Sequence, residues 1–184
     1  MVKLSIVIPA YNEEKTIENT TKTYIDFLDK KLKNQYEILI IPNGCKDNTV
    51  NIVKKVSNEY KQINYFDIGS PGSKGSAVLK GFELSNGELI GFVDADLSSS
   101  PSAFYSLLEN IGDNDGIIAS RALKNSKINI KQPLSRRFVG KTFNLLVRML
   151  LGLNFYDTQC GCKLFKKKAI KEIYNKFHIT GWAF

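Results

Sequence analysis

The chain has 184 residues, of which 43% are hydrophobic and 24% are charged, and this is enough for one globular domain with a sizeable core. Its formal net charge of +8 favours anionic partners, namely nucleic acid, phosphorylated metabolites or an anionic membrane surface. The alternative is that the charge serves solubility alone. Three cysteines and a single histidine argue against a disulfide framework, a zinc site and a histidine-based catalytic triad.

Apolar, β-branched runs predict buried strands over much of the chain. The predicted strands cover residues 3–9, 36–41, 63–68, 88–94 and 115–120. Helical patterns alternate with them, and we expect the first helix to begin at Asn12, with Glu13 and Glu14 in its first turn. Its apolar stripe consists of Ile17, Tyr24, Ile25, Leu28 and Leu32. This alternation is typical of an α/β domain with a mostly parallel central sheet flanked by helices.

Three further helices are predicted between the strands. The first begins at Asp47 or Asn48 and ends near Tyr60, and the next covers residues 77–85 behind a glycine-rich loop. Ser100 and Pro101 are the expected N-cap and first residue of the last.

The last third of the chain has a different character. Residues 134–155 read as a helix that is apolar around most of its circumference, with a basic stripe of Arg137, Lys141 and Arg148. Such a helix either lies in a membrane interface or is a core helix with a solvated edge, and both interpretations stay open. No stretch approaches the roughly 18 apolar residues of a membrane span. Because the chain ends on bulky apolar residues, we expect it to be truncated at its C-terminus.

Polar side chains gather in the loops that follow the predicted strands. In open parallel sheets, ligands bind beyond the carboxyl ends of the strands. That rule selects loops at residues 9–13, 42–47, 69–75, 94–98 and 120–122. The polar residues in these loops are Tyr11, Glu13, Asn43, Lys74, Asp94, Asp96 and Arg121.

Asp94 and Asp96, two residues apart beyond a buried strand, have the chemistry of a divalent metal site. Mg²⁺ and Mn²⁺ prefer oxygen ligands and often share a site with substrate phosphates, although an isolated DxD is more often a turn. Lys74, in the glycine-rich loop before the helix predicted at 77–85, is a candidate anion contact together with the backbone N–H groups at that helix start. The loop lacks the spacing of a P-loop, and its alternative interpretation is a flexible connection. Arg121, Arg136 and Arg137 suit phosphate; for the last two the alternative is a solvated helix start.

Six segments of the chain, in order, resemble family 2 glycosyltransferases of the GT-A fold. These are "IVIPAYNEEKTI", "GSKGSAVLKGF", "DADLSS", "SR" at 120–121, "DTQCGCKLF" at 157–165 and the final "GWAF". Within that family the chain looks like the dolichyl-phosphate glucosyltransferases and dolichol-phosphate mannose synthases. The resemblance covers essentially the whole chain and implies the GT-A (Rossmann-like) fold. It also implies a single catalytic domain, with residues 1–122 binding the nucleotide-sugar and 123–184 the acceptor. The candidate membrane-interface helix, at 134–153, lies in the acceptor-binding part.

The resemblance also implies roles for individual residues. It assigns the nucleotide-sugar to Pro9, Ala10, Tyr11, Glu13, Asn43, Lys74, Asp94 and Ala95. It assigns Mg²⁺ or Mn²⁺ chiefly to Asp96, with Asp94 beside it, and the acceptor phosphate to Arg121, Arg136 and Arg137. Two departures from the family pattern stand out. Asn43 replaces an acidic residue, which bears on the identity of the donor, and Ser98 replaces a common glutamine, which makes it a weaker group near the metal.

The expected activity is transfer of a hexose, with inversion, from UDP-glucose or GDP-mannose to a polyprenyl (dolichyl) phosphate. Asp94, Asp96, Arg121 and Asp157 are the expected catalytic residues. One rival is a transferase that uses a glycan hydroxyl, for which Asp157 is the candidate base; another is a non-catalytic nucleotide-sugar or membrane-binding module. No nucleic-acid motif accompanies the positive charge, so nucleic acid is not an expected partner. The expected location is the cytoplasmic face of a membrane, as a peripheral protein.

Overall fold

The computed structural model describes residues 2–69, 72–121, 142, 144–145, 147–150, 152, 155 and 157–176. The chain divides into two compact units, Met1–Ile117 with Gly161–Phe184, and Ile118–Cys160. The predicted single catalytic domain, with its boundary after residue 122, stays a prediction.

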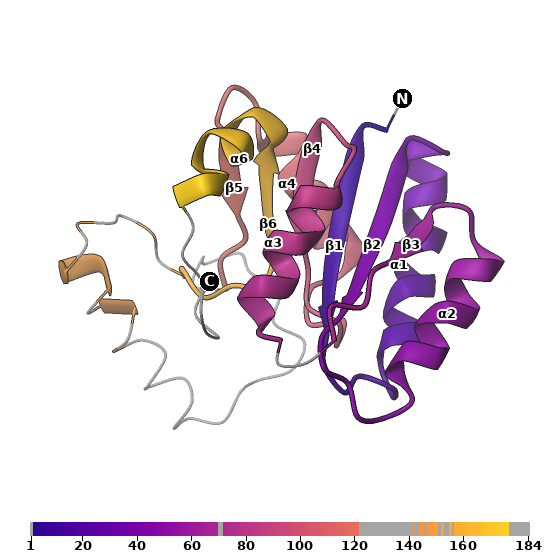
Figure 1. Ribbon diagram of the computed structural model, residues 1–184. Helices are drawn as coiled ribbons and strands as arrows, with labels where there is room; N and C mark the ends of the chain where they lie inside the picture. Colours follow the sequence, from indigo (N-terminus) through magenta and orange to yellow (C-terminus); the bar gives the residue numbers. More distant parts are fainter. Residues whose placement is uncertain are drawn as a thin grey trace. The chain divides into compact units, whose positions relative to one another are not determined.

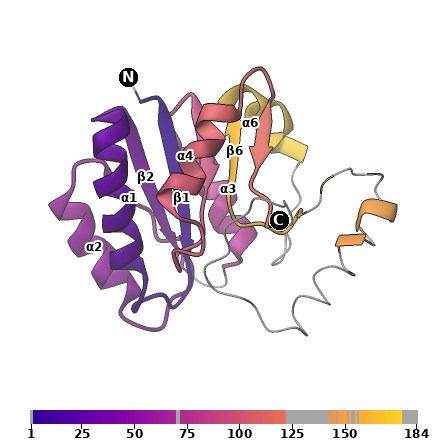
Figure 2. The same ribbon diagram turned by 180° about the vertical axis from the view of Figure 1, so that it is seen from behind.

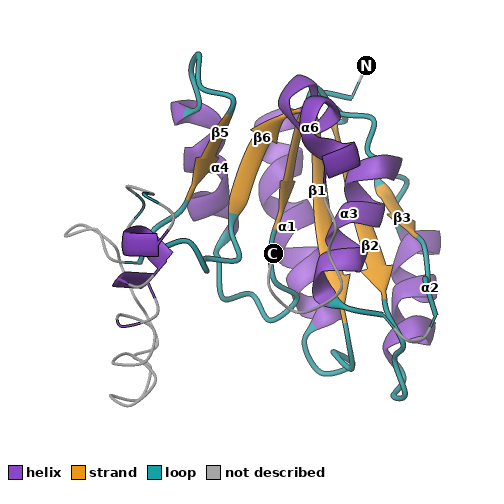
Figure 3. Cartoon of the chain, turned by 60° about the vertical axis from the view of Figure 1, so that its left-hand side comes forward, coloured by secondary structure: helices purple, strands orange, loops and turns teal. Residues whose placement is uncertain are grey.

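The centre of the first unit is a mostly parallel sheet (Figure 1). Its strands are β1 (Leu4–Ala10), β2 (Tyr36–Pro42), β3 (Ile63–Tyr65), β4 (Leu89–Phe92), β5 (Gly116–Ile118) and β6 (Lys163–Lys166). Their order is β3-β2-β1-β4-β6-β5, which places β3 and β5 at opposite edges (Figure 3). β1 pairs in parallel with β2 and β4, β2 pairs in parallel with β3, and β6 runs antiparallel to β4.

Helices cover both faces of this sheet. The helices are α1 (Ile17–Leu32), α2 (Thr49–Glu59), α3 (Lys74–Leu84), α4 (Pro101–Asn110) and α6 (Lys167–Ile173), and a 3-10 turn at Tyr174–Lys176 follows α6. α3 and α6 lie on the face seen in Figure 1, while α1 and α4 lie on the other face (Figure 2). Every residue of β1 and β2 is buried, because both faces of these strands are covered.

The expected strands and most helix positions are confirmed. The predicted apolar stripe of α1 is buried along its length, and Ser100 caps α4 with Pro101 as its first residue. The start of α1 was predicted wrongly at Asn12. Asn12 Oδ1 accepts a hydrogen bond from Lys46 N (2.7 Å) rather than from the first turn of a helix, and the N-cap is Thr16, so the helix begins at Ile17.

Two other parts of the fold differ from the expectation. α3 begins at Lys74 rather than at residue 77, because Ser73 and Ser76 form a reciprocal capping box at its N-terminus. β6 and α6 were not predicted from the sequence at all. β6 is only four residues long and is held by its antiparallel pairing with β4, which has no local signature.

In the second unit, the described residues 142, 144–145 and 147–150 are helical, within the helix expected at 134–155. Leu145, Met149 and Leu150 are exposed there, while Arg148 is half-buried. Arg136, Arg137 and Lys141 lie outside the described residues. Among the residues that the structure describes, no helix has both the length and the apolar character needed to cross a bilayer.

Candidate active site

Helix α1 supports the acidic loop that follows β4. Thr20 Oγ1 donates a 2.7 Å hydrogen bond to the carbonyl oxygen of Ala95, between the two aspartates. One helical turn later, Tyr24 OH donates to the carbonyl oxygen of Ser99 (2.8 Å). Burial raises the pKa of the Tyr24 hydroxyl, and the nearby Cys162 and Asp94 add to this shift, so the donor keeps its proton well into the alkaline range.

Asp94 forms an ion pair with Lys74, which is the first residue of α3. The Lys74 ammonium contacts Asp94 Oδ1, and both side chains are about one-third exposed (32% and 28%). The capping box at the start of α3 fixes the backbone that carries Lys74. The pair therefore places a cation and a carboxylate together at the carboxyl edge of the sheet, accessible to solvent.

Asp96 faces solvent, and its carboxylate shapes the loop. Asp96 Oδ1 accepts a hydrogen bond from Ser98 N (2.9 Å), an Asx-type turn, and Leu97 between them has φ +57°. The second oxygen of Asp96 has no hydrogen bond to any described residue. No group of three or more His, Cys, Asp or Glu side chains in the described part of the chain could enclose a metal by itself. The donor set nevertheless fits Mg²⁺ or Mn²⁺ in a site that substrate phosphates complete, because such ions accept one or two carboxylates with phosphate oxygens.

The loops after β1 and β2 are joined into one structure. Asn43 N donates to the carbonyl oxygen of Ala10 (3.0 Å), and Glu13 N donates to Thr49 Oγ1 (2.8 Å). Asp47 receives hydrogen bonds from Glu14 N and from Thr49. Although partial burial opposes it, these bonds lower the pKa of the Asp47 carboxyl below its usual value. The carboxylate thus stays ionised and holds the two loops together.

Asn43 is buried at the junction of these loops, with 3% of its surface exposed. Gly72 packs directly against it: a Cβ atom at position 72 would lie 2.7 Å from the Asn43 Cβ. Pro9 and Ala10 are buried within β1, so their side chains belong to the core, whereas Tyr11 is 45% exposed beside them. Tyr11 therefore offers an accessible aromatic surface for a ligand at the end of β1.

Arg121 and Asp157 meet in the second unit. Arg121 donates to both carboxylate oxygens of Asp157, from Nε to Oδ2 (2.8 Å) and from Nη2 to Oδ1 (2.9 Å). Arg121 N also donates to Oδ2 (3.0 Å). The Asp157 side chain is only 8% exposed and that of Arg121 is 49% exposed, so the carboxylate orients a guanidinium that still faces solvent.

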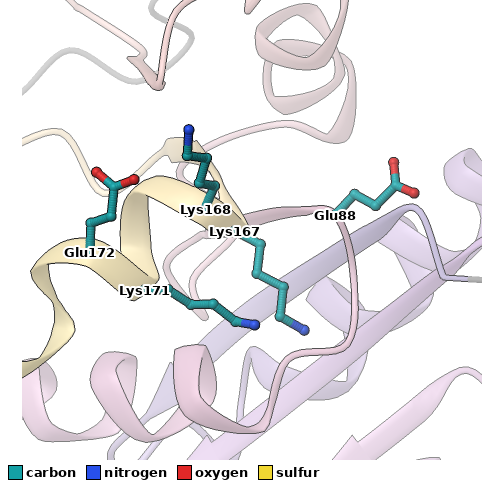
Figure 4. A pocket seen from close by; sticks show the side chains of 5 residues that line it. All are labelled: Glu88, Lys167, Lys168, Lys171 and Glu172. Atoms are coloured by element: carbon teal, nitrogen blue, oxygen red, sulfur yellow. The ribbon is translucent and has the colours of Figure 1, made fainter.

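A shallow hollow of about 540 Å³ lies at the end of β4 that is opposite to the acidic loop (Figure 4). Glu88, Lys167, Lys168, Lys171 and Glu172 line it. Glu88 precedes β4, whereas Asp94 follows it, so this hollow is at the amino edge of the parallel strands. Its walls are long charged side chains and Lys167 Nζ is bonded to the Ser85 carbonyl oxygen (2.7 Å), so the hollow is not the candidate active site.

The structure brings together some of the predicted site residues. Within the first unit, Lys74 lies beside Asp94, and the segments holding Tyr11, Glu13 and Asn43 are joined by hydrogen bonds. Arg121 and Asp157 pair in the second unit, so their placement beside the acidic loop stays a prediction. Sequence reasoning missed the support given by Thr20 and Tyr24. A threonine on the apolar stripe of α1, one turn before a buried tyrosine, was the available signal.

A parallel α/β sheet with an acidic pair and a lysine at its carboxyl edge has the arrangement of a nucleotide-binding transferase. The glycosyl transferase family 2 model matches residues 5–174, so the chain belongs to this family of glycosyltransferases. The dolichyl-phosphate beta-glucosyltransferase of Dictyostelium discoideum is 33% identical over 195 aligned residues, which cover all of this chain and 60% of that protein. The predicted family and enzyme class are therefore confirmed.

Solved structures confirm the GT-A fold. Glucosyl-3-phosphoglycerate synthase from Mycobacterium tuberculosis, solved with Mn²⁺ and UDP, superposes with a TM-score of 0.64 at 18% identity, over 92% of this chain and 58% of that one. The mannosyltransferase PcManGT from Pyrobaculum calidifontis, solved with GDP-Man and Mn²⁺, gives 0.63 at 15% identity, over 93% of this chain and 46% of that one. These proteins bind Mn²⁺ and either a uridine or a guanosine nucleotide.

Proposed function

We propose that this chain transfers a hexose from a nucleotide-sugar to a polyprenyl (dolichyl) phosphate, with inversion at the anomeric carbon. The observation that carries the donor half is the grouping of Lys74, Asp94 and Asp96 at the carboxyl edge of the sheet. The acceptor half is supported by relatives named dolichyl-phosphate beta-glucosyltransferase that align with the whole chain. The chain spans about 60% of the length of those relatives, so the activity of the whole relatives comes to this chain as a proposal.

For the donor, we favour UDP-glucose over GDP-mannose, since these relatives are glucosyltransferases by name. The joined loops after β1 and β2 would hold the nucleoside, with Tyr11, Glu13 and Asn43 as contacts. Lys74 would exchange part of its interaction with Asp94 for a phosphate oxygen. That exchange is feasible because the pair is partly exposed and a phosphate carries more charge than one carboxylate.

Asp96 would be the principal ligand of Mg²⁺ or Mn²⁺, and Asp94 its neighbour on the nucleotide side. When bound, such an ion supplies positive charge that stabilises the departing nucleoside diphosphate. The contribution of the chain itself is to hold the acidic loop still. Two hydrogen bonds from α1, donated by Thr20 and Tyr24, do this at the loop's backbone.

The acceptor phosphate would act as its own nucleophile. A phosphate monoester is largely doubly ionised at neutral pH because its second pKa is about 6, so its oxygen needs no general base. In the proposed step this oxygen forms a bond to the anomeric carbon as the bond from that carbon to the diphosphate oxygen breaks. Arg121, oriented by Asp157, would bind the acceptor phosphate, together with Arg136 and Arg137.

The rival with a glycan hydroxyl acceptor would require Asp157 as a general base. That carboxylate accepts three hydrogen bonds from Arg121 and is 8% exposed. These bonds occupy both carboxylate oxygens, and little of the side chain is open to a substrate hydroxyl. The contacts thus support an orienting role for Asp157 rather than that of a base.

A membrane surface is the proposed location of the acceptor, at its cytoplasmic face. Four exposed apolar side chains in the second unit support this: Leu145, Met149, Leu150 and Phe155 are 51–80% exposed. Leu145 and Met149 are four residues apart in a helical segment and therefore share one side of it. Exposed apolar residues on one helical side, in a chain of net charge +8, suit an anionic lipid interface.

The test is transfer of labelled glucose from UDP-glucose, or mannose from GDP-mannose, to dolichyl phosphate in detergent with Mn²⁺. We expect a labelled glycolipid from one donor, and its loss in EDTA and in Asp96→Asn. Transfer to a soluble glycan alone would favour the rival acceptor. Metal-dependent binding of UDP or GDP with no transfer to any acceptor would instead favour the non-catalytic module.

A further inference from the structure

Asp94 lies directly opposite Gly161, across the gap between β4 and the segment that leads into β6. The antiparallel register pairs Leu89 with Lys166 and Phe92 with Lys163. Continuing this register by two residues on each strand places Asp94 opposite Gly161. Side chains in such opposed positions are close neighbours, so the residue at 161 determines how much room the Asp94 carboxylate has.

The carboxylate occupies the space that a side chain at position 161 would need. A Cβ atom built on Gly161 would lie 2.0 Å from Asp94 Oδ2, 2.5 Å from its Cγ and 2.8 Å from its Oδ1. Gly161 is not among the glycines with positive φ. A positive φ is therefore not the reason for glycine at this position, and the three atoms nearest to a Cβ there all belong to Asp94.

The residues that flank Asp94 and Gly161 are buried, which restricts movement of either backbone. Val93 and Ala95, which flank Asp94, are 0% and 4% exposed, and Cys160 and Cys162, which flank Gly161, are 6% and 0% exposed. Both backbones are thus anchored in the core. A methyl group at position 161 would have to be accommodated by rotation of the Asp94 side chain, away from its contact with Lys74.

We propose that Gly161 is a positioning residue for the nucleotide-sugar site. Without a side chain, it lets the Asp94 carboxylate lie against the chain before β6 while Lys74 holds Oδ1. The proposal deepens the proposed function, on which it rests, by adding a residue that determines the orientation of the donor-side carboxylate without touching the donor.

The experiment compares Gly161→Ala with Gly116→Ala. Gly116, in β5, is also a crowded glycine, but its Cβ would meet the ring of Phe165 at 2.5 Å instead of a carboxylate. The affinity for UDP with Mn²⁺ is measured by titration calorimetry for both variants and the wild type. Thermal midpoints are measured for the same proteins and for Asp94→Ala and Asp94→Ala/Gly161→Ala.

We expect Gly161→Ala to weaken UDP binding by about tenfold or more, and Gly116→Ala to leave it within about twofold, although both variants lose thermal stability. In the Asp94→Ala background, Gly161→Ala should lower the thermal midpoint by about one degree or less, because the carboxylate that obstructs the methyl group is absent. If Gly161→Ala alone fails to fold, recovery of folding in the double variant supports the proposal, and failure of both contradicts it.

Two results would overturn the proposal. One is a folded Gly161→Ala protein that binds UDP as tightly as the wild type does. The other is that Gly161→Ala lowers the thermal midpoint as much in the Asp94→Ala background as in the wild type. Failure of the proposed function looks different. In that case the wild type itself binds neither UDP nor GDP and transfers neither glucose nor mannose. The thermal midpoints of the single and double variants still decide whether Gly161 sets the position of Asp94.

Discussion

The hydroxyl of Tyr24, in the middle of α1, is bonded at 2.8 Å to the backbone of Ser99, 75 residues further along the chain. Thr20 makes the equivalent bond to Ala95, one turn earlier on the same helix. Because the two acceptor carbonyls bracket Asp96, the helix fixes the loop on both sides of the proposed metal ligand. A rigid element thus supports an otherwise exposed loop.

Replacing Tyr24 by phenylalanine should test this support. The variant leaves the Ser99 carbonyl without its donor, and we expect a loss of about 1–2 kcal/mol in the free energy of unfolding, together with weaker UDP binding. Urea denaturation and calorimetry provide the two measurements. Tyr105→Phe is the matched control, since Tyr105 OH makes no hydrogen bond to any described residue. Equal losses in the two variants would contradict the expectation.

Tyr24 should also make the protein sensitive to alkali. Its pKa is raised in the folded state by burial, whereas in the unfolded chain it ionises near pH 10. Above about pH 10 the unfolded chain loses this proton and the folded protein keeps it, so stability falls by up to about 1.4 kcal/mol per pH unit. Below about pH 10 both states are protonated and the contribution is complete. The measurement is urea denaturation between about pH 9 and pH 11, a range centred on the ordinary tyrosine pKa of about 10. Over this range the free energy of unfolding should decline less in Tyr24→Phe than in wild type.

Lys74→Gln should weaken donor binding without unfolding the protein. The Lys74–Asp94 pair is about one-third exposed, so solvent screening limits its contribution to stability to about 1 kcal/mol or less. The loss of a cation beside the phosphates should lower UDP affinity by about tenfold, and by less at high salt. Lys80→Gln is the control, because Lys80 lies on the same helix with similar exposure (29%) and pairs with Glu83. Comparable effects of the two substitutions on affinity would refute a specific role.

Asp96→Asn should separate metal binding from folding. An asparagine oxygen can still accept the hydrogen bond from Ser98 N, so the turn and the thermal midpoint should be preserved. The charge that attracts Mn²⁺ is lost, and the gain in UDP affinity caused by Mn²⁺ should fall by about tenfold or more. Asp113→Asn, at an exposed loop position, serves as the control. An unchanged response to Mn²⁺ would remove Asp96 from the metal site.

Asp157→Asn distinguishes an orienting carboxylate from a general base. We expect a higher KM for dolichyl phosphate and a loss of about 1–3 kcal/mol in stability, because the charge-assisted bonds of Arg121 are weakened. The pH dependence of kcat should keep its shape. A general base would behave differently: kcat would collapse and the acidic limb of its pH profile would disappear.

The parts of the fold that were predictable are those with a local cause. The apolar runs of β1 and β2 and the Ser100–Pro101 helix start carry their structure in neighbouring residues. The start of α1 was wrong because Asn12, a good cap by type, instead bonds to the backbone of Lys46, a partner 34 positions away. β6 was missed for the same reason, since its strand character depends on β4.

The candidate site divides in the same way. Asp94 and Asp96 stood out because they follow a buried strand, and the rule for parallel sheets selected their edge. The pairing of Lys74 with Asp94 spans 20 residues, and the opposition of Asp94 to Gly161 spans the segment between two strands whose pairing was unknown. Residue types therefore indicated the chemistry, but the sheet order was needed to show which side chains restrain one another.

The strand order also determines when the sheet can be finished as the chain is synthesised. β6 lies between β4 and β5, although both of these precede it in the sequence. Until residues 163–166 have been made, one side of β4 has no strand to pair with, and unpaired strand edges promote association with other chains. The completed sheet closes this edge at a late stage, so we expect chains ending before β6 to aggregate rather than to fold into a smaller version of the domain.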